Sequence, residues 1–250
     1  MGIGARQLSW DGCLNVRDLG GHPAGNGSTT RFGTVVRADN IRRLSERGWD
    51  SLVDYGVTRI VDLRSDDELS ADPAASAPIE TVRAPVLHGE DERYWQQLVA
   101  ISEAAPSDVA AVQAVYESFL ARFHVGFAEA VAAVATAGNS CVVVHCVEGK
   151  DRAGLVSALL LRLAGVGVEH IAADYALSNA NLAPRLRPWI DEAGTEEERA
   201  RRRRISATPA GAMSGALLWI EREYGSVHHY LREGGLDDPV LEAARARLTG

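Results

Sequence analysis

The pattern of apolar and polar residues predicts strands and helices that alternate along the first part of the chain. Short runs rich in β-branched and apolar residues indicate strands at residues 34–37, 58–63, 81–85 and 141–145. Ser45 and Ser65 each precede an amphipathic segment, and Glu68 completes a capping-box pattern with Ser65, so we expect helices after both serines. Apolar residues at helical spacing between residues 90 and 137 predict two further helices, separated at Pro106.

Beyond residue 152 the pattern is helical almost to the end. Alternating strands and helices followed by helices alone are typical of an α/β protein. We therefore expect a small, central, mainly parallel sheet flanked by helices, with a helical C-terminal part. A chain of this length fits a single domain over residues 1–250, in which residues 180–210 are a candidate helical lid. The predicted C-terminal helices lie at residues 153–164, 168–179, 184–192 and 209–224, and from residue 238 onward.

Composition and charge indicate where the protein is located and which partners and cysteine-based sites are expected. Hydrophobic residues make up 46% of the chain, and no apolar run approaches the ~20 residues of a membrane span, so no integral membrane segment is expected. The first residues lack the apolar core of a signal peptide, which predicts a cytoplasmic protein, with unconventional secretion as the alternative. The net charge of −8 disfavours nucleic acid as a partner. Three cysteines without paired metal-type spacing predict neither a zinc site nor a disulfide framework.

One loop carries the strongest chemical signal. The predicted strand at residues 141–145 leads into Cys146, five residues separate this cysteine from Arg152, and a predicted helix follows. Backbone N–H groups and a helix N-terminus stabilise a thiolate, which is the nucleophilic form of cysteine. The intervening residues can form a nest of N–H groups around a phosphoryl group, and the planar guanidinium of Arg152 can bind two of its oxygens. The spacing therefore predicts a phosphate-binding loop with Cys146 as the nucleophile.

The residues within and just after this loop are candidates for substrate binding. Gly149 permits a backbone angle that a tight loop needs. Lys150 is the only lysine of the chain, and we expect its charge at the rim of the site. There it would attract densely phosphorylated groups, whereas Glu148 would repel them, and the sequence leaves the balance between the two open. The candidate substrate-binding residues are Val147, Glu148, Gly149, Lys150 and Ala153.

Two other interpretations of this loop are less favoured. A cysteine can pack in the core as a small hydrophobe, but the ordered succession of strand, glycine, lysine, aspartate, arginine and helix disfavours this explanation. The Gly149-Lys150 pair also occurs in nucleotide-binding P-loops. That pattern requires a glycine where Val144 stands and a hydroxyl residue where Asp151 stands, so it fails at both positions.

A charge-dense tract at residues 196–204 stands apart from the rest of the chain. Its order, acidic first and basic afterwards, suits the dipole of a helix. We weigh two hypotheses for it, namely a solvated surface helix and a mobile flap that presents arginines to a phosphorylated substrate.

The loop and four motifs outside it resemble the bacterial protein tyrosine phosphatase family. The resemblance covers most of the chain and implies a cysteine-phosphatase fold, a cysteinyl-phosphate intermediate, and no metal or cofactor. It also implies hydrolysis of phosphotyrosine, which in relatives broadens to phosphoserine, phosphothreonine and phosphoinositides, so the expected partner is a phosphorylated protein or phosphoinositide. The motifs, beside the Gly-Lys-Asp-Arg form of the loop, are Asn15-Val16-Arg17-Asp18, Val61-Asp62-Leu63-Arg64-Ser65, Ala173-Asp174-Tyr175 with Ser178-Asn179, and Tyr224-Gly225-Ser226 with Tyr230-Leu231.

Carried over by position, the resemblance assigns roles to four loop residues. Cys146 is the expected nucleophile and Arg152 the phosphate clamp. Lys150 and Asp151 are expected to influence substrate choice and proton handling. Cys146 opens the predicted loop, and Lys150, Asp151 and Arg152 are consecutive residues at its end.

The chain departs from the family pattern at two points. Most such loops place a serine or threonine after the arginine, and its hydroxyl stabilises the departing thiolate. This chain has Ala153 there, which predicts slow breakdown of the phosphoenzyme. The second point is the general acid that protonates the leaving alcohol, for which Asp151, Asp91 and Glu90 are the candidates.

The residues and the resemblance together predict a cysteine-dependent phosphomonoesterase, a hydrolase of the tyrosine or dual-specificity type. A sulfurtransferase is one alternative, since such enzymes also set a cysteine in a loop before a helix. A phosphate-recognition module with weak turnover is the other, and Ala153 favours it. Arg152, with Lys150 and Asp151, suits a tetrahedral oxyanion and a leaving alcohol better than a sulfur-transfer substrate.

Overall fold

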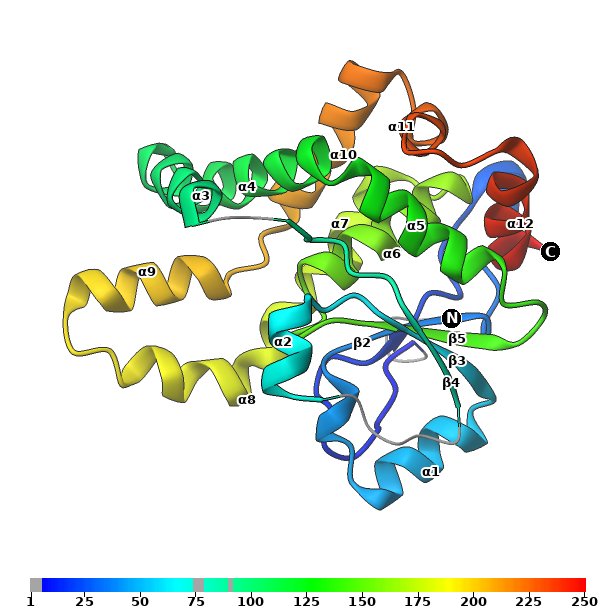
Figure 1. Cartoon of the computed structure of the whole chain (residues 1–250), viewed down its shortest axis with the longest axis horizontal. Helices are drawn as coiled ribbons and strands as arrows, with labels where there is room; N and C mark the ends of the chain where they lie inside the picture. The colour runs from blue at the N-terminus through cyan, green and yellow to red at the C-terminus, as the bar shows by residue number, and fades with distance from the viewer. Residues whose placement is uncertain (1–5, 74–78, 90–91) are drawn as a thin grey trace.

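The structure, a computed structural model, describes residues 6–73, 79–89 and 92–250, and at its centre lies one sheet of five strands (Figure 1). The spatial order is β1-β2-β5-β3-β4, with β1 antiparallel to β2 and the other pairs parallel. β5, the last strand along the chain, is therefore the central strand, between β2 and β3. The strands are β1 (Arg17–Asp18), β2 (Val35–Ala38), β3 (Val57–Asp62), β4 (Glu80–Arg83) and β5 (Cys141–His145).

Helices cover both faces of this sheet. In Figure 1, α1 lies on one side, and α4 to α7 lie on the other with the C-terminal helices α10 to α12, whereas α8 and α9 project from the body. The expected α/β fold, with a mainly parallel sheet and a helical C-terminal part, is confirmed. The helices are α1 (Glu46–Asp54), α2 (Asp66–Ala71), α3 (Glu92–Ala104), α4 (Asp108–Arg122), α5 (His124–Ala135), α6 (Arg152–Leu163), α7 (Val168–Ala176), α8 (Ser178–Asp191), α9 (Glu196–Ser206), α10 (Ala210–Tyr224), α11 (Val227–Glu233) and α12 (Asp238–Thr249), with short 3-10 turns at Gly25–Gly27 and Ile41–Arg43.

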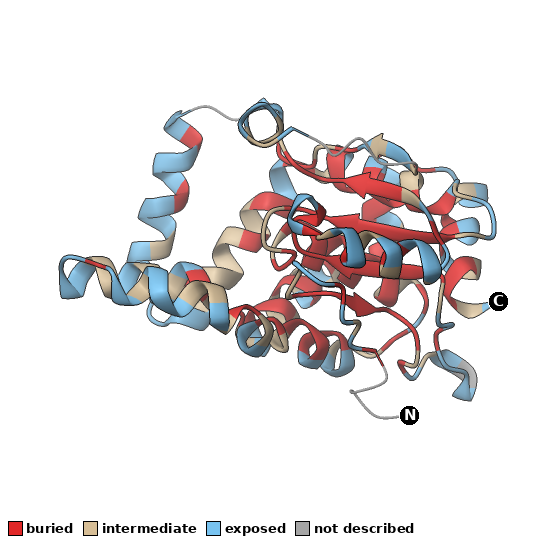
Figure 2. Ribbon diagram, turned by 90° about the horizontal axis from the view of Figure 1, so that it is seen from below, coloured by how far each residue is buried: buried red, intermediate tan, exposed pale blue. Residues whose placement is uncertain are grey.

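The register of the strands sorts their side chains to the two faces. Val36, Val143 and Ile60 are register partners and pack in a smaller apolar cluster on the α1 side. Val144 belongs to the larger cluster, to which α3 to α7 and α10 to α12 contribute, and Figure 2 shows the buried sheet between the two layers. Successive side chains on a strand alternate in direction, and Arg37 is the register partner of Val144, so Arg37 lies on the face covered by α6.

Most strands and two helix starts agree with the sequence-based predictions. The four predicted strands correspond to β2, β3, β4 and β5 with boundaries shifted by no more than two residues, and β1 is too short to give a periodic signal. Ser45 is the N-cap of α1, where its hydroxyl accepts a hydrogen bond from the N–H of Gly48. The capping box of α2 is complete, because Ser65 and Glu68 each accept from the backbone N–H of the other.

The prediction of two helices between residues 90 and 137 was wrong. Three helices lie there, and the second break falls at Phe123, which ends α4 and precedes α5 without any proline or glycine. Phe123 is buried and packs edge-on against Tyr94 of α3, so tertiary packing sets this turn. Among the described residues no single helix is long and apolar enough to cross a membrane; α4 and α5 pass that test only when taken together, and they meet at an angle of 81°.

The predicted helices at residues 168–179 and 184–192 also needed correction. α7 ends at Ala176, and α8 begins at Ser178, so that Pro184 and Pro188 lie inside α8 although Pro184 was expected to open it. Ser178 is fully buried and its hydroxyl accepts a hydrogen bond from Arg17, which fixes the start of α8 from outside the helix. α11 was not predicted, and the charge-dense tract does form a helix, α9.

A buried cluster of charges lies between the sheet and α7. Asp174 of α7 accepts hydrogen bonds from Nε of Arg17 at 3.3 Å and from Nη1 of Arg37 at 3.5 Å, and all three side chains are at most 2% exposed. Burial alone would favour the neutral acid, but the charges of Arg17 and Arg37 outweigh it and lower the pKa of Asp174. The carboxylate therefore stays ionised and compensates two guanidinium groups that have left water.

We expect Asp174→Asn to destabilise the fold by about 3–5 kcal/mol at neutral pH, because two buried arginines lose their counter-charge. Folding lowers the pKa of Asp174, so this contribution to stability is complete above the pKa of an unfolded aspartate, about 3.9, and is lost as the pH falls below it. Urea unfolding from pH 7 to pH 3 should show a difference between wild type and variant that shrinks toward low pH. Asp50→Asn, at an exposed position of α1, is the control; equal stability of wild type and Asp174→Asn at pH 7 would contradict the prediction.

Candidate active site

The cysteine loop connects the central strand to a buried helix. Cys146 directly follows β5, and α6 begins at Arg152, so the loop lies at the carboxyl ends of the parallel strands, where α/β proteins bind ligands. Cys146 is 2% exposed and borders the larger apolar cluster. Gly149 has a positive φ of 65°, and a Cβ placed there would lie 2.4 Å from the carbonyl oxygen of Ala38, so both conformation and space require glycine.

The surrounding scaffold holds the carbonyl oxygens of the loop. In a trans peptide the C=O and the following N–H point in opposite directions, and no cis peptide occurs among the described residues. The oxygens of residues 147–150 face the surrounding elements and that of Asp151 points along α6, so we infer that the N–H groups of residues 148–152 face the inside of the loop, as an anion-binding nest requires. Val147 O accepts from the Asn40 N–H (3.0 Å), Glu148 O from Asn15 Nδ2 (3.0 Å), Gly149 O from Arg37 Nη2 (2.6 Å), Lys150 O from Arg37 Nη2 (3.4 Å) and Asp151 O from the Leu155 N–H (2.8 Å).

Glu68 of α2 holds the predicted phosphate clamp. Both terminal nitrogens of Arg152 donate to the carboxylate of Glu68, Nη2 at 2.7 Å from Oε1 and Nη1 to Oε2. Burial opposes the charge on Arg152, but these bonds, together with the charges of Cys146 and Asp151, raise its pKa. The sequence predicted that Cys146 and Arg152 lie on one loop. It predicted Glu68 only as part of a helix capping box, and nothing in the sequence connected Glu68 with Arg152.

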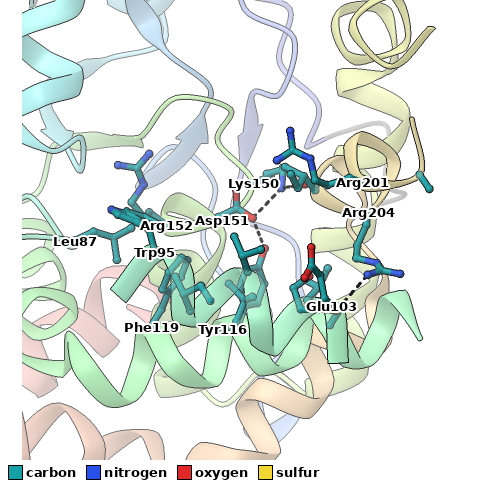
Figure 3. A pocket seen from close by; sticks show the side chains of 18 of the residues that line it. Leu87, Trp95, Glu103, Tyr116, Phe119, Lys150, Asp151, Arg152, Arg201 and Arg204 are labelled. Atoms are coloured by element: carbon teal, nitrogen blue, oxygen red, sulfur yellow. Dashed lines mark hydrogen bonds and ion pairs between the residues drawn. The ribbon is translucent and has the colours of Figure 1, made fainter. Parts of the chain in front are cut away.

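Asp151 lies in a network of three side chains. Its Oδ1 accepts hydrogen bonds from Nζ of Lys150 at 2.9 Å and from the hydroxyl of Tyr116 in α4 at 2.6 Å (Figure 3). Burial would favour the neutral acid, but Lys150 and Tyr116 outweigh it and lower the pKa of Asp151. Tyr116 was not foreseen, because nothing near it in the sequence marks a site.

Lys150 is not at an exposed rim, as the sequence suggested, but only 6% exposed. Besides Asp151, its ammonium group donates to the carbonyl oxygen of Ile205 in α9 at 2.9 Å. A lysine that bridges a carboxylate and a backbone carbonyl can leave water without an uncompensated charge. The bond also joins the loop to α9.

Glu148, on the opposite side of the loop, is neutralised by two arginines. Its carboxylate is 2.9 Å from Nη1 of Arg185 in α8 and 3.4 Å from Nη2 of Arg43. Arg185 also pairs with the buried Asp39 at 2.9 Å, so α8 contacts the loop through an ion pair. The repulsion that Glu148 would exert on a phosphorylated ligand is therefore reduced by its own partners.

A pocket of about 650 Å³ lies beside the loop (Figure 3). Lys150, Asp151 and Arg152 form one part of its wall, and Arg201 and Arg204 of α9 line it as well. The tract that forms α9 thus brings arginines to a pocket, as one of the two hypotheses for it required. Most of the remaining wall is apolar and comes from Trp95, Leu98 and Val99 of α3, Val112, Val115 and Phe119 of α4, and Ile205 of α9.

Three candidate residues remain, of which the structure describes one. Ala153 is fully buried at the start of α6 and brings no hydroxyl to the loop. Glu90 and Asp91, two of the candidates for the general acid, lie outside the described residues. In the part of the chain that the structure describes, no group of three or more histidine, cysteine, aspartate or glutamate side chains could hold a metal ion.

Comparisons with known proteins identify the family of the chain. Residues 8–250 match the model of the tyrosine phosphatase family. A protein of Cupriavidus necator named "Putative tyrosine-protein phosphatase" is 31% identical over 250 residues, which cover 99% of this chain and 88% of that protein. The triple specificity protein phosphatase PtpB of Mycobacterium tuberculosis is 29% identical over 96% of this chain and 98% of its own length, and a tyrosine-protein phosphatase of Nostoc commune is 25% identical over 90% and 78%. The chain therefore belongs to the tyrosine phosphatase family.

Proposed function

We propose that this hydrolase cleaves phosphomonoesters through a covalent bond between phosphorus and Cys146. The thiolate of Cys146 attacks phosphorus, the S–P bond forms, and the P–O bond to the alcohol breaks. The inward N–H groups of residues 148–152 and the guanidinium of Arg152 bind the phosphoryl oxygens as negative charge builds on them. The observation that carries this proposal is the set of loop carbonyls held from outside, since it leaves the N–H groups free for the phosphoryl group.

The leaving alcohol takes a proton from a general acid, and water then attacks phosphorus and displaces the Cys146 sulfur. The lowered pKa of Asp151 keeps it ionised at neutral pH, which suits a base that accepts the proton of this water. Because Asp151 takes the role of this base, we propose Asp91, one of the three candidates from the sequence, as the acid of the first step, with Glu90 as the alternative. The products are the alcohol, inorganic phosphate and the regenerated thiolate.

We propose phosphotyrosine as the preferred substrate, on a phosphorylated protein. The pocket beside Arg152 is largely apolar and large enough for an aromatic ring, whose burial favours binding by about 25 cal/mol per Å² of apolar surface. A serine or threonine phosphate has no ring to bury there. Phosphoserine, phosphothreonine and phosphoinositides are slower substrates in this proposal. The pairing of Glu148 with Arg43 and Arg185 reduces its repulsion of a densely phosphorylated phosphoinositide headgroup.

We also propose a role for the segment of residues 180–210, and separately a cellular location. α8 contacts the loop through Arg185, and α9 does so through the Ile205 carbonyl, so this segment is in position to act as a lid over a single domain of residues 1–250.

The proposed location is cytoplasmic. Such a location would keep the nucleophile reduced, and the three cysteines are free in the structure.

A panel of phosphotyrosine, phosphoserine and phosphothreonine peptides and phosphoinositides tests the function. We expect the highest kcat/KM for phosphotyrosine, and a loss of at least about a thousandfold in Cys146→Ser. Cys13→Ser, at a partly exposed cysteine, is the control that should keep wild-type activity. Tight phosphopeptide binding without hydrolysis by the wild type would select the phosphate-recognition module, and thiosulfate turnover without phosphatase activity would select a sulfurtransferase.

Glu68→Gln should lower kcat/KM for an aryl phosphate by about tenfold, because the paired carboxylate that aims Arg152 is lost. Glutamine can still serve at the third position of the capping box, so the melting temperature should change little. Glu68→Ala removes both functions and should lower activity and stability together. A rise in kcat/KM for Glu68→Gln would show instead that Glu68 competes with the phosphate for Arg152.

Ala153→Thr should raise turnover wherever breakdown of the phosphoenzyme limits the rate, since a hydroxyl at this position stabilises the departing thiolate. Ala153 is fully buried, so Ala153→Ser, which adds less volume, is the companion variant. Rapid-mixing kinetics separate the burst from the steady state. An unchanged or lower steady-state rate in a stably folded Ala153→Ser protein would exclude this explanation.

A further inference from the structure

We propose that Tyr116 is a positioning residue for the reaction. It holds one carboxylate oxygen of Asp151 so that the other oxygen faces the attacking water. The inference rests on the proposed function, because it gives a role to the Asp151 carboxylate in the phosphatase reaction. Tyr116 belongs to α4, and 35 residues separate it from Asp151 along the chain.

The side chain of Asp151 does not do what an aspartate at its position usually does. Asp151 is the N-cap of α6, and such a carboxylate normally accepts from a backbone N–H of the first helical turn. Here it makes no such capping bond. Lys150 and Tyr116 both donate to Oδ1, and among the described residues no donor reaches Oδ2. The carboxyl group is thus fixed through one oxygen while the other is left for chemistry.

The hydroxyl of Tyr116 can donate in only one direction. An ionised carboxylate only accepts hydrogen bonds, so Tyr116 must donate its single proton to Asp151. The hydroxyl of Tyr175 in α7 lies 2.7 Å from that of Tyr116 and must then donate to it. Burial, followed by the charge of Asp151, raises the pKa of both tyrosines, so both stay protonated donors. The result is a directed chain from Tyr175 through Tyr116 to Asp151.

Packing keeps this donor in place. Tyr116 and Tyr175 are each 1% exposed, and their rings meet edge to face with centroids 5.9 Å apart. Tyr116 also lines the pocket beside the loop, and its hydroxyl points toward Asp151 in the wall of that pocket (Figure 3). The charges of Lys150 and Arg152 also act on Asp151. The other charged groups that line the same pocket are Glu103, Glu197, Arg201 and Arg204.

Tyr116→Phe removes the hydroxyl and keeps the ring. We expect kcat for an aryl phosphate to fall by about tenfold. Loss of a hydrogen bond to the charged form favours protonation of Asp151, so the acidic limb of the kcat profile should move to higher pH. Tyr230→Phe is the matched control, since it removes another buried tyrosine hydroxyl, bonded to the Leu120 carbonyl of α4, that does not touch the loop. Its activity and pH profile should match the wild type.

The double variant Tyr116→Phe with Asp151→Asn shows whether Tyr116 acts through Asp151. If it does, the double variant should be no slower than Asp151→Asn alone, because the carboxylate that Tyr116 positions is already gone. Effects that multiply, or a Tyr116→Phe profile that superimposes on the wild type, would overturn the inference. Absence of hydrolysis by the wild type, or full activity of Cys146→Ser, would instead refute the proposed function, so the two failures are distinct.

Discussion

The site depends on a hydrogen bond from a buried arginine to the peptide carbonyl of Gly149. Arg37 donates to this oxygen at 2.6 Å and turns the peptide so that its N–H faces inward. A guanidinium can stay at this depth only if its charge is compensated, and Asp174 provides the compensation while it also pairs with Arg17. The conformation of the cysteine loop at Gly149 is therefore held by a buried charge cluster that consists of Arg37, Asp174 and Arg17.

The sheet order explains why one strand end can collect so many partners. β5 comes last in the sequence and lies between β2 and β3, so residues that follow each of the three strands meet around the loop. Asn40 follows β2 and holds the carbonyl of Val147, and Glu68 in the helix after β3 holds Arg152. A nucleophile at the end of an edge strand would have neighbours on one side only.

The sequence alone predicted the parts of the site that are local. Cys146, Gly149 and Arg152 lie on one loop, and the strand before it and the helix after it were recognisable from periodicity. The contacts that were not predicted are distant. The Asn15 amide, which the sequence marked only as part of a family motif, binds the carbonyl of Glu148 from 133 residues away, and Tyr116 reaches Asp151 from another helix. The turn at Phe123 was missed for the same reason, because an aromatic contact with Tyr94 causes it and no local residue encodes it.

The separation of Arg17 from Asp174 by 157 residues has a consequence for synthesis of the chain. As a ribosome releases the polypeptide from its amino end, Cys146 emerges before the carboxylate that neutralises Arg17 and Arg37. Until Asp174 follows, the charge of Arg37 cannot be buried with a counter-charge, so Arg37 is not held in position to bind the carbonyl of Gly149. We therefore expect the nascent chain to carry the cysteine before the loop around it is formed. The loop around the thiol should become ordered only at a late stage of translation, after most of the domain has been synthesised.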